Sequence, residues 1–515
     1  MRPQRAPRRG ERRVGWSCAG TLLAGIAFAT PAAANPFDMV GYDTDTGSIA
    51  NAAIGWGRSI GVLNSNPALL VDVDPQLTLG LLLLAPQLHV RLQQRPAGSD
   101  VPMSIYDSNL GTTQGLDERS LPSVELASRR SDTHATSPET RLGVGFATDF
   151  GIDRLRIGVL AQLPITGGHA ASIQTHYEDE REANFSNRLH FTRLGEWERI
   201  ATVLLGGGFR VTDQLSVGGA LQLAASATAR LGVYIPDAAV QDQSSSNMDS
   251  QFETRWRPIA GIRWAPAKWA SIGASWRNES YFQVDGVSDV TLWNYHEPSS
   301  THTTLKRSAQ GFPVVFDYEP MEASLGGGVK NGPVSFQVSA NWERWSHYLD
   351  HHGQTADQAA ILPSSPFPHT SIDGSKYAFH DTVSLRGGAI YRWAKDLETS
   401  LGGAYYPSPV PAQVGRTSYV DSAIVGITGG QRIGFDLFGH RIVASLGAQF
   451  WRMVTRTTHK DPSQVYDEMP DQVRTIQNGQ TLREASGLQT NNPGFPGYEA
   501  SGWVFAASTS LAYGF

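Results

Sequence analysis

The residues with the clearest potential for catalysis lie near the amino terminus. Gly57, Ser59 and Gly61 follow the G-x-S-x-G spacing that presents a nucleophilic serine in many hydrolases. That motif requires a buried strand before the serine and a helix after it. Here a segment of small residues precedes the serine, and Pro67 would interrupt a helix on its other side. We therefore expect a glycine-rich loop at this position and no catalytic nucleophile.

A second cluster contains His347, Asp350, His351 and His352. Three imidazoles and a carboxylate could bind zinc, and His347 and His351 would share one face of a helix. Such a site needs a helix, but this stretch follows a predicted strand and reaches Gly353 at once. We expect the end of a strand and a solvated outer loop, with no metal and no cofactor.

Arginines form the third group of candidates, because alternation places six of them on the predicted inward face of strands. The planar arginine side chain binds a carboxylate through two parallel hydrogen bonds, so a fatty-acid headgroup is one suitable partner. The alternative, which we favour, is pairing with internal acids such as Glu253 and Glu343. The six candidates are Arg156, Arg255, Arg257, Arg263, Arg386 and Arg392.

The first 34 residues have the three parts of a secretory signal peptide. Six arginines precede a short apolar core at residues 21–29, and Ala32-Ala33-Ala34 offers a cleavage site. The apolar run is too short for a membrane anchor. Cys18, the only cysteine, lies within this segment, so we expect a mature chain without disulfides or thiol chemistry.

Charge and hydropathy limit the classes of protein to which the mature chain can belong. The net charge of −6 becomes more negative once the basic leader is removed, which excludes a basic nucleic-acid surface. No later apolar stretch approaches the roughly 18 residues of a membrane helix. The mean hydropathy of −0.27 is typical of soluble proteins. A transmembrane β-barrel has similar values, because only every second residue of its strands faces lipid.

Alternation of apolar and polar residues with period two recurs along the chain, as in residues 155–163, 215–223, 334–342, 383–393 and 442–450. Short turns and long polar segments alternate between these stretches, as periplasmic turns and outer loops do in outer-membrane barrels. The expected outer loops cover roughly residues 93–140, 167–200, 226–252, 288–318, 349–382, 407–420 and 453–500. The sequence predicts an all-β, transmembrane antiparallel barrel of about 14 strands. The strands start near residues 77, 141, 155, 201, 215, 254, 269, 320, 333, 383, 398, 421, 440 and 502.

Aromatic residues support the barrel over a soluble β-sandwich or propeller, which alternation alone does not exclude. The last strand ends in Phe515, which resembles the signal read by the barrel-assembly machinery. Outer-membrane lipid and lipopolysaccharide are further expected partners. The candidates for interfacial girdles are Trp256, Trp264, Trp269, Trp276, Trp393 and Tyr513.

The segment before the first strand contains Asn64-Ser65-Asn66-Pro67-Ala68-Leu69-Leu70. It resembles the amino-terminal segment of the FadL/TodX family of hydrophobic-compound transporters, and residues 205–223, 259–276, 342–348 and 401–411 resemble that family's internal hairpins. The resemblance implies a hatch at residues 35–75, with Asn66, Pro67 and Ala68 in its motif, inside a barrel at residues 76–515. A plain turn at Asn66-Pro67 is the alternative. The long, His-rich or acidic outer loops depart from the family pattern, so its ligand contacts do not transfer.

This reading predicts passive uptake of hydrophobic molecules across the bacterial outer membrane by a monomer without catalytic activity. Fatty acids, alkanes and aromatic hydrocarbons remain open as cargo. The alternatives are a general diffusion porin for small polar solutes and, less in keeping with the sequence, a surface enzyme on a β scaffold.

A lateral exit is the last candidate feature. Pro164 lacks a backbone donor, and Gly167 and Gly168 tolerate unusual dihedral angles. The family resemblance implies a kink in this third strand that opens the wall toward lipid. The alternative is a strand that simply ends at Pro164.

Overall fold

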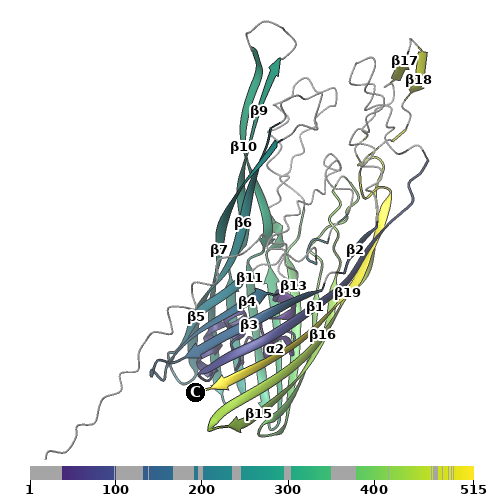
Figure 1. Ribbon diagram of the computed structural model, residues 1–515. Helices are drawn as coiled ribbons and strands as arrows, with labels where there is room; N and C mark the ends of the chain where they lie inside the picture. The colour runs from purple at the N-terminus through teal and green to yellow at the C-terminus, as the bar shows by residue number, and fades with distance from the viewer. Residues whose placement is uncertain are drawn as a thin grey trace, which may run out of the picture.

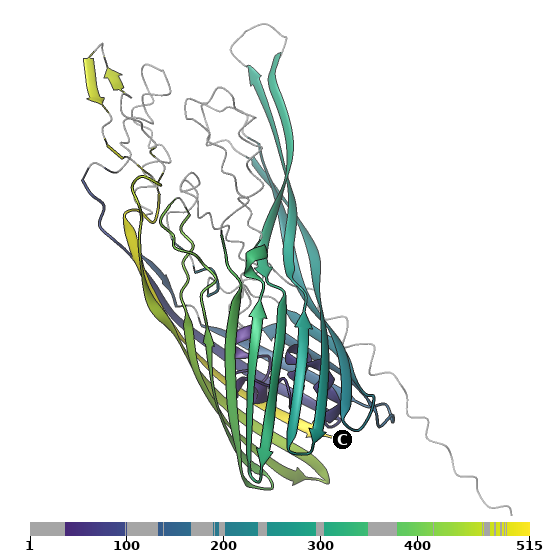
Figure 2. The ribbon, with the colours of Figure 1, turned by 180° about the vertical axis from the view of Figure 1, so that it is seen from behind.

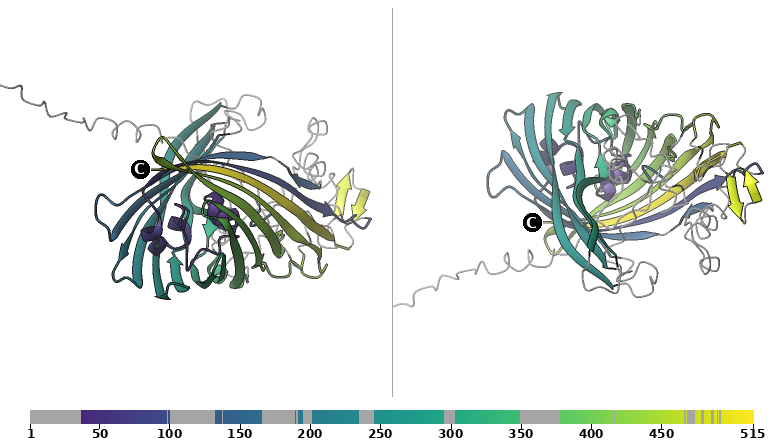
Figure 3. Two further views of the ribbon diagram at one scale, coloured as in Figure 1. Left: turned by 90° about the horizontal axis from the view of Figure 1, so that it is seen from below. Right: turned by 90° about the horizontal axis from the view of Figure 1, so that it is seen from above.

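The computed structural model describes residues 37–97, 99, 132–136, 138–165, 189, 191–194, 201–234, 245–294, 303–348, 378–415, 417–465, 467, 474–477, 480–484, 487–488, 490 and 492–515. Within these residues, one antiparallel sheet closes on itself through pairing of its first and last strands, β1 and β19. Residues 37–72 lie inside this ring of strands (Figure 1, Figure 3). The predicted signal peptide, residues 1–34, lies outside the described residues.

Fourteen of the described strands make up the closed ring, which confirms the predicted barrel and its strand number. β1 and β19 pair without interruption from Gln76↔Gly514 to Leu92↔Tyr498, so the sheet has no free edge there. In chain order the strands are β1 (Gln76–Leu92), β3 (Glu139–Thr148), β4 (Leu155–Pro164), β5 (Thr202–Arg210), β6 (Leu215–Tyr234), β7 (Ser245–Ala267), β8 (Ala270–Arg277), β11 (Glu322–Asn331), β12 (Val334–Glu343), β13 (Thr382–Ala394), β14 (Leu397–Tyr406), β15 (Ile424–Leu437), β16 (His440–His459) and β19 (Gly497–Gly514).

The alternation predicted the two faces of the wall. Leu81 and Leu83 of β1 are exposed, whereas Leu82 and Leu84, which alternate with them, face inward and are buried. The aromatic residues proposed for the girdles are also exposed, as interfacial anchors must be. They are Trp256, Trp264, Trp269, Trp276, Trp393 and Tyr513. The outer surface is therefore apolar in the way that a lipid-facing barrel requires.

The two ends of the barrel differ. Tight turns join β7 to β8, β11 to β12, β13 to β14 and β15 to β16 at the end that also holds the C-terminus (Figure 1, Figure 2). Strands and long connections extend from the opposite end. By the usual rule for such barrels, the end with short turns faces the periplasm.

Several segments expected to be outer loops are in fact strands. β6 and β7 continue through much of residues 226–252, and β16 runs on to His459. β9 (Ser280–Asn294) and β10 (Thr303–Glu319) form a hairpin that stands above the ring (Figure 1). The expectation of loops was wrong because a strand that stands in water has polar residues on both faces, and then its sequence does not alternate. Three short strands complete the structure: β2 (Thr133–Ala135), which pairs with β1, and the pair β17 (Arg474–Gln477) and β18 (Gln480–Glu484).

The described helices are all short. Four lie within residues 37–72: α1 (Phe37–Val40), α2 (Thr44–Gly47), α3 (Val62–Ser65) and the 3-10 helix η1 (Pro67–Asp72). Another 3-10 turn, η4 (Trp345–His347), comes after β12. Among the described residues, none of the helices has the length and apolar character needed to cross a bilayer.

Candidate functional site: the luminal segment and the barrel interior

Residues 37–72, here called the luminal segment, fold around two capping side chains. Asp43 caps α2, accepting hydrogen bonds from Thr46 N at 2.8 Å and Thr46 Oγ1 at 2.6 Å. The same carboxylate accepts from Gly61 N at 2.8 Å and so connects two parts of the segment that are 18 residues apart. A side chain that satisfies several donors fixes the local path of the chain, so Asp43 holds these two parts of the segment together.

The Asn-Pro-Ala motif begins the helix η1 and contacts the barrel wall. Asn66 is fully buried and caps η1, where its Oδ1 accepts from Ala68 N at 3.1 Å. Its amide nitrogen donates to Ile54 O at 2.8 Å and to Ile262 O of β7 at 3.1 Å. Pro67 comes after the end of α3 and occupies the first turn of η1, where a missing N–H costs nothing. The motif therefore ties the segment to the wall as well as turning the chain.

Glycines let the wall approach the luminal segment closely. A Cβ atom added at Gly218 of β6 would lie 2.4 Å from Ala68 N, and one at Gly273 of β8 would lie 2.0 Å from Ile54 O. Similar close approaches to the segment occur on most strands around the ring. We call these positions the glycine belt: Gly145, Gly158, Gly208, Gly218, Gly261, Gly273, Gly326, Gly328, Gly388, Gly402 and Gly430.

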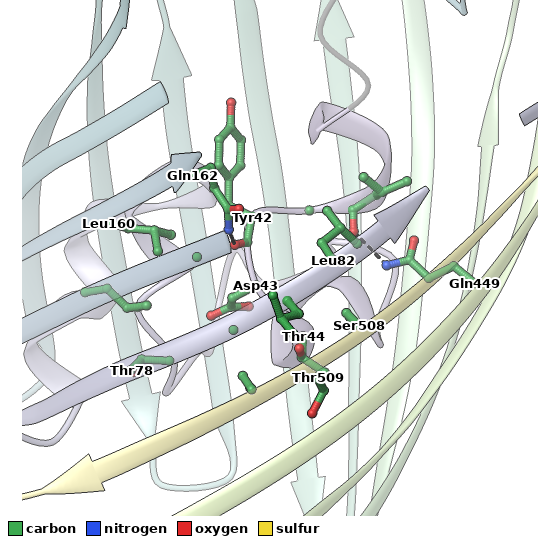
Figure 4. Close-up of a pocket in the computed structure, with 17 residues that line it drawn as sticks. Tyr42, Asp43, Thr44, Thr78, Leu82, Leu160, Gln162, Gln449, Ser508 and Thr509 are labelled. Carbon is green, nitrogen blue, oxygen red and sulfur yellow. Dashed lines mark hydrogen bonds between the residues drawn. The ribbon is translucent and has the colours of Figure 1, made fainter. Parts of the chain in front are cut away.

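Glutamine and hydroxyl side chains of the wall complete the contact. Gln162 donates to Tyr42 O, and Gln449 donates to Val40 O at 2.7 Å (Figure 4). The cavity left at this boundary, lined by both glutamines, measures only about 20 Å³. A space of that size holds about one water molecule. The segment and the wall are therefore closely packed at this boundary.

Ion pairs join the luminal segment to the wall at the periplasmic end. Asp72 accepts a hydrogen bond from Arg210 at 3.1 Å and forms an ion pair with Arg263 at 3.0 Å. Arg58 pairs with Glu398 of β14, and Asp45 lies 3.2 Å from Arg432 of β15. The segment is thus held by charges at one end, by glycine contacts around its circumference and by Asn66 near its centre.

Apolar side chains fill the interior next to and above the luminal segment. The cluster joins residues of the segment to residues of β1, β14, β16 and β19. Its largest wall members are Leu84, Tyr406, Trp451, Met453 and Tyr498. An apolar interior favours hydrophobic molecules over polar solutes, since each buried methylene contributes about 0.8 kcal/mol.

A second, polar region of the interior contains buried arginine–glutamate pairs. Arg255 and Arg257 both pair with Glu319, each at 2.8 Å, and all three side chains are buried. Arg277 pairs with Glu322 and also donates to Asn64 of the luminal segment at 3.1 Å. Buried charges need such partners, because an isolated charge in the interior is costly.

All six arginines proposed from the sequence have acidic partners in the structure. Arg255 and Arg257 pair with Glu319, and Arg263 pairs with Asp72, as described above. Arg156 lies 2.7 Å from Asp149, and Arg392 lies 2.8 Å from Glu398. Arg386 lies 3.9 Å from Glu322. Of the two acids that the sequence suggested, Glu343 accepts hydrogen bonds from Trp345 and Ser384. The side chain of Glu253 lies outside the described part of the structure. A ligand-binding role for these arginines remains a prediction.

Pro164 is the last residue of β4. Its neighbour Ile165 donates to Thr140 O of β3 at 2.9 Å, so the ladder toward β3 continues past the proline. Toward β5 the described pairing stops earlier, at Gln162↔Thr202. Gly167 and Gly168 lie outside the described residues. The described strand ends at Pro164, and both a lateral opening and a plain strand end remain predictions.

The two motifs that suggested chemistry lack the required context. Ser59 lies in a loop with no strand before it. His347 belongs to η4, and its Nδ1 lies 2.7 Å from Glu279 Oε2, while residues 350–352 lie outside the described residues. Among the described residues, no group of three or more metal-binding side chains is arranged around a common point.

Comparisons with known proteins agree with this architecture. Residues 168–420 match the family model of the outer membrane protein transport protein family (OMPP1/FadL/TodX). A Pseudomonas aeruginosa FadL homologue of known structure is similar, with 14% identity, a TM-score of 0.52, and coverage of 95% of this chain and 99% of that chain. The likeness at this identity concerns the fold.

Two further structures are similar at lower scores. The toluene transporter TodX of P. putida has 11% identity, a TM-score of 0.45, and coverage of 93% of this chain and 99% of that chain. The toluene transporter TbuX of Ralstonia pickettii has 11% identity, a TM-score of 0.44, and coverage of 93% and 100%. No curated protein matches the sequence. With its closed 14-stranded barrel and its match to the family model over residues 168–420, the chain is similar to the outer membrane protein transport (OMPP1/FadL/TodX) family.

Proposed function

We propose that this protein is a channel for the passive uptake of hydrophobic molecules across the outer membrane, such as long-chain fatty acids or hydrocarbons. The family match and the lipid-facing barrel support this function. The observation that carries the proposal is the apolar interior beside a luminal segment that closely approaches most strands of the wall. Cargo enters from the outer loops, occupies the apolar interior and leaves after a rearrangement.

We further propose the division of the chain that supports this mechanism. Residues 1–34 are a cleaved signal peptide, residues 35–75 are a hatch, and residues 76–515 are the barrel. Lipopolysaccharide and outer-membrane lipid surround a monomer, which the barrel-assembly machinery recognises through the terminal Phe515. The protein has no catalytic role in this proposal, in keeping with a family of transport proteins.

A diffusion porin is the rival function, and ion conductance separates the two. A porin conducts ions steadily, whereas a barrel closed by residues 37–72 should conduct little. Deleting residues 36–70 should raise the current in a planar bilayer about tenfold or more, since about 14 strands enclose a wide lumen. An intact protein with steady current, unchanged by the deletion, would favour the porin.

The route of exit is a second point that an experiment can decide. We propose that hydrophobic cargo leaves sideways into lipid beside β4, because a chain molecule gains nothing by entering water. The end of β4–β5 pairing at Gln162↔Thr202 and the missing donor of Pro164 support this route.

The test replaces Pro164, Gly167 and Gly168 with Val, Thr and Thr, which can pair in a regular ladder. Uptake of labelled oleate by cells should fall severalfold, while the barrel still inserts and shifts on a gel after boiling. If uptake by the triple variant equals that of the native protein, the cargo does not leave at this strand.

A further inference from the structure

A cavity of about 420 Å³ lies at the periplasmic end of the barrel. The luminal segment forms one side of it, and the ends of β7 and of β11 to β15 form the other. We call this cavity the vestibule. Its size falls within the range of small-molecule binding sites. It is lined in part by Arg58, Arg263, Lys330, Arg392 and Arg432.

Positive charge exceeds negative charge in the vestibule. Five cationic side chains line it, against the carboxylates Asp45, Asp72 and Glu398. Glu398 is shared: it pairs with Arg58, with Arg392 at 2.8 Å and with Arg432 at 3.8 Å. Arg432 also lies 3.2 Å from Asp45, so two carboxylates serve three arginines and one positive charge is in excess.

The pKa of Arg58 is consistent with this excess. Burial, followed by the neighbouring charge of Arg432, lowers the pKa of Arg58 to about 10. The guanidinium is still protonated at neutral pH, so it remains a donor to a bound anion.

Lys330 supplies a cation whose neighbour is aromatic rather than acidic. Its Nζ lies 4.2 Å from the ring centroid of Trp56 in the luminal segment. No carboxylate pairs with this ammonium group anywhere in the part of the chain that the structure describes. An ammonium held against a ring in a site of excess positive charge is available to an incoming anion.

Part of the lining is apolar and could contact an organic body. Trp56, Ile49 and Ala53 contribute from the luminal segment, and Pro333 and Ile390 contribute from the wall. A ring or short chain could pack there while its charged end meets the cations. The lining as a whole is mixed, with polar and charged side chains in the majority, so an anion with a small apolar body suits it better than a wholly apolar molecule.

We propose that the vestibule is a binding site for a small organic carboxylate with a compact apolar body, reached from the periplasm. Arg392 and Lys330 bind the carboxylate, and Trp56 with Ile49 packs against the body. The site differs from the apolar interior on the other side of the luminal segment, and its existence does not depend on which cargo crosses the membrane.

Calorimetric titration of the full-length protein in lipid nanodiscs tests the site, with protein-free nanodiscs as the baseline. The probes are 1-naphthoate, its neutral counterpart 1-naphthamide, and inorganic phosphate. We expect 1-naphthoate to bind with a dissociation constant at least about tenfold lower than that of 1-naphthamide or phosphate, because only it offers both charge and an apolar body. If 1-naphthoate and 1-naphthamide bind equally, the site does not select for a negative charge. If phosphate binds as tightly as 1-naphthoate, the site does not require an apolar body. Either result would overturn the proposal.

Variants locate the binding. The double variant Lys330→Gln, Arg392→Gln should weaken 1-naphthoate binding about tenfold or more, while Glu398 keeps Arg58 and Arg432 as partners. Lys268→Gln is the matched control, since Lys268 is exposed in the turn before β8 and does not line the vestibule. A gel shift on boiling shows that each variant is folded. Unchanged binding by the folded double variant, or an equal loss in the control, would contradict the proposal.

Discussion

Gly218→Val is expected to open the barrel to ions without unfolding it. A Cβ at this position would lie 2.4 Å from Ala68 N and equally close to the carbonyl carbon of Pro67, and both atoms belong to backbone that cannot rotate away. Valine is well suited to a strand, so the ladder of β6 should persist while η1 is pushed from the wall. In a planar bilayer we expect the mean current to rise about tenfold or more, toward that of an unplugged lumen of about 14 strands.

The neighbouring residue provides the control. A Cβ at Gly219 would point away from the lumen, with Ile259 O as its nearest neighbour at 3.8 Å. Gly219→Val adds the same volume and the same strand preference, and we expect its conductance to match that of the native protein. Equal currents from the two variants would mean that the contact between Gly218 and η1 does not hold the luminal segment in place.

Glu319→Ala is expected to cause the largest loss of stability among single substitutions in the interior. Glu319 is buried and pairs with both Arg255 and Arg257. Its removal would leave two buried guanidinium groups without their carboxylate, although Arg257 keeps its hydrogen bonds to Asn278 O and Pro320 O. Breaking a buried ion pair from one side costs about 3–5 kcal/mol, which urea unfolding in phospholipid vesicles can measure through tryptophan emission.

An exposed ion pair gives the comparison. Arg91 and Glu499 lie 2.8 Å apart on the outer surface, where the Arg91 side chain is 72% exposed. Water and salt screen such a pair, so Glu499→Gln should leave the unfolding midpoint almost unchanged. If Glu319→Ala were equally mild, the arginines would have enough other partners and the pair would not be a main support of the interior.

The sequence predicted the barrel well because one physical rule governs its membrane-spanning part. A strand with lipid on one side and the lumen on the other must alternate, and this pattern located strands such as β4 and β12 nearly to the residue. The rule no longer applies above the membrane. There β6, β7, β9 and β10 stand in water, and their polar residues gave the expectation of loops.

The interior was harder to predict because it depends on contacts between distant parts of the chain. Alternation indicated that Arg255 and Arg257 face inward, but Glu319 lies more than 60 residues away and does not stand out in the sequence. The glycine belt left a visible trace in pairs such as Gly207-Gly208 and Gly218-Gly219. Only the structure shows which glycine of each pair faces the luminal segment, and only it brings Lys330 next to Trp56.

Uptake by whole cells tests the central claim most directly, because the lipopolysaccharide leaflet, rather than phospholipid, slows the entry of hydrophobic molecules. Cells that lack their own channels for such molecules would carry the native protein or an empty vector, and would receive labelled oleate, toluene or sucrose. We expect the protein to speed the entry of at least one hydrophobic compound severalfold and to leave sucrose entry unchanged. Faster entry of sucrose with no gain for either hydrophobic compound would contradict the proposed function and identify a diffusion porin.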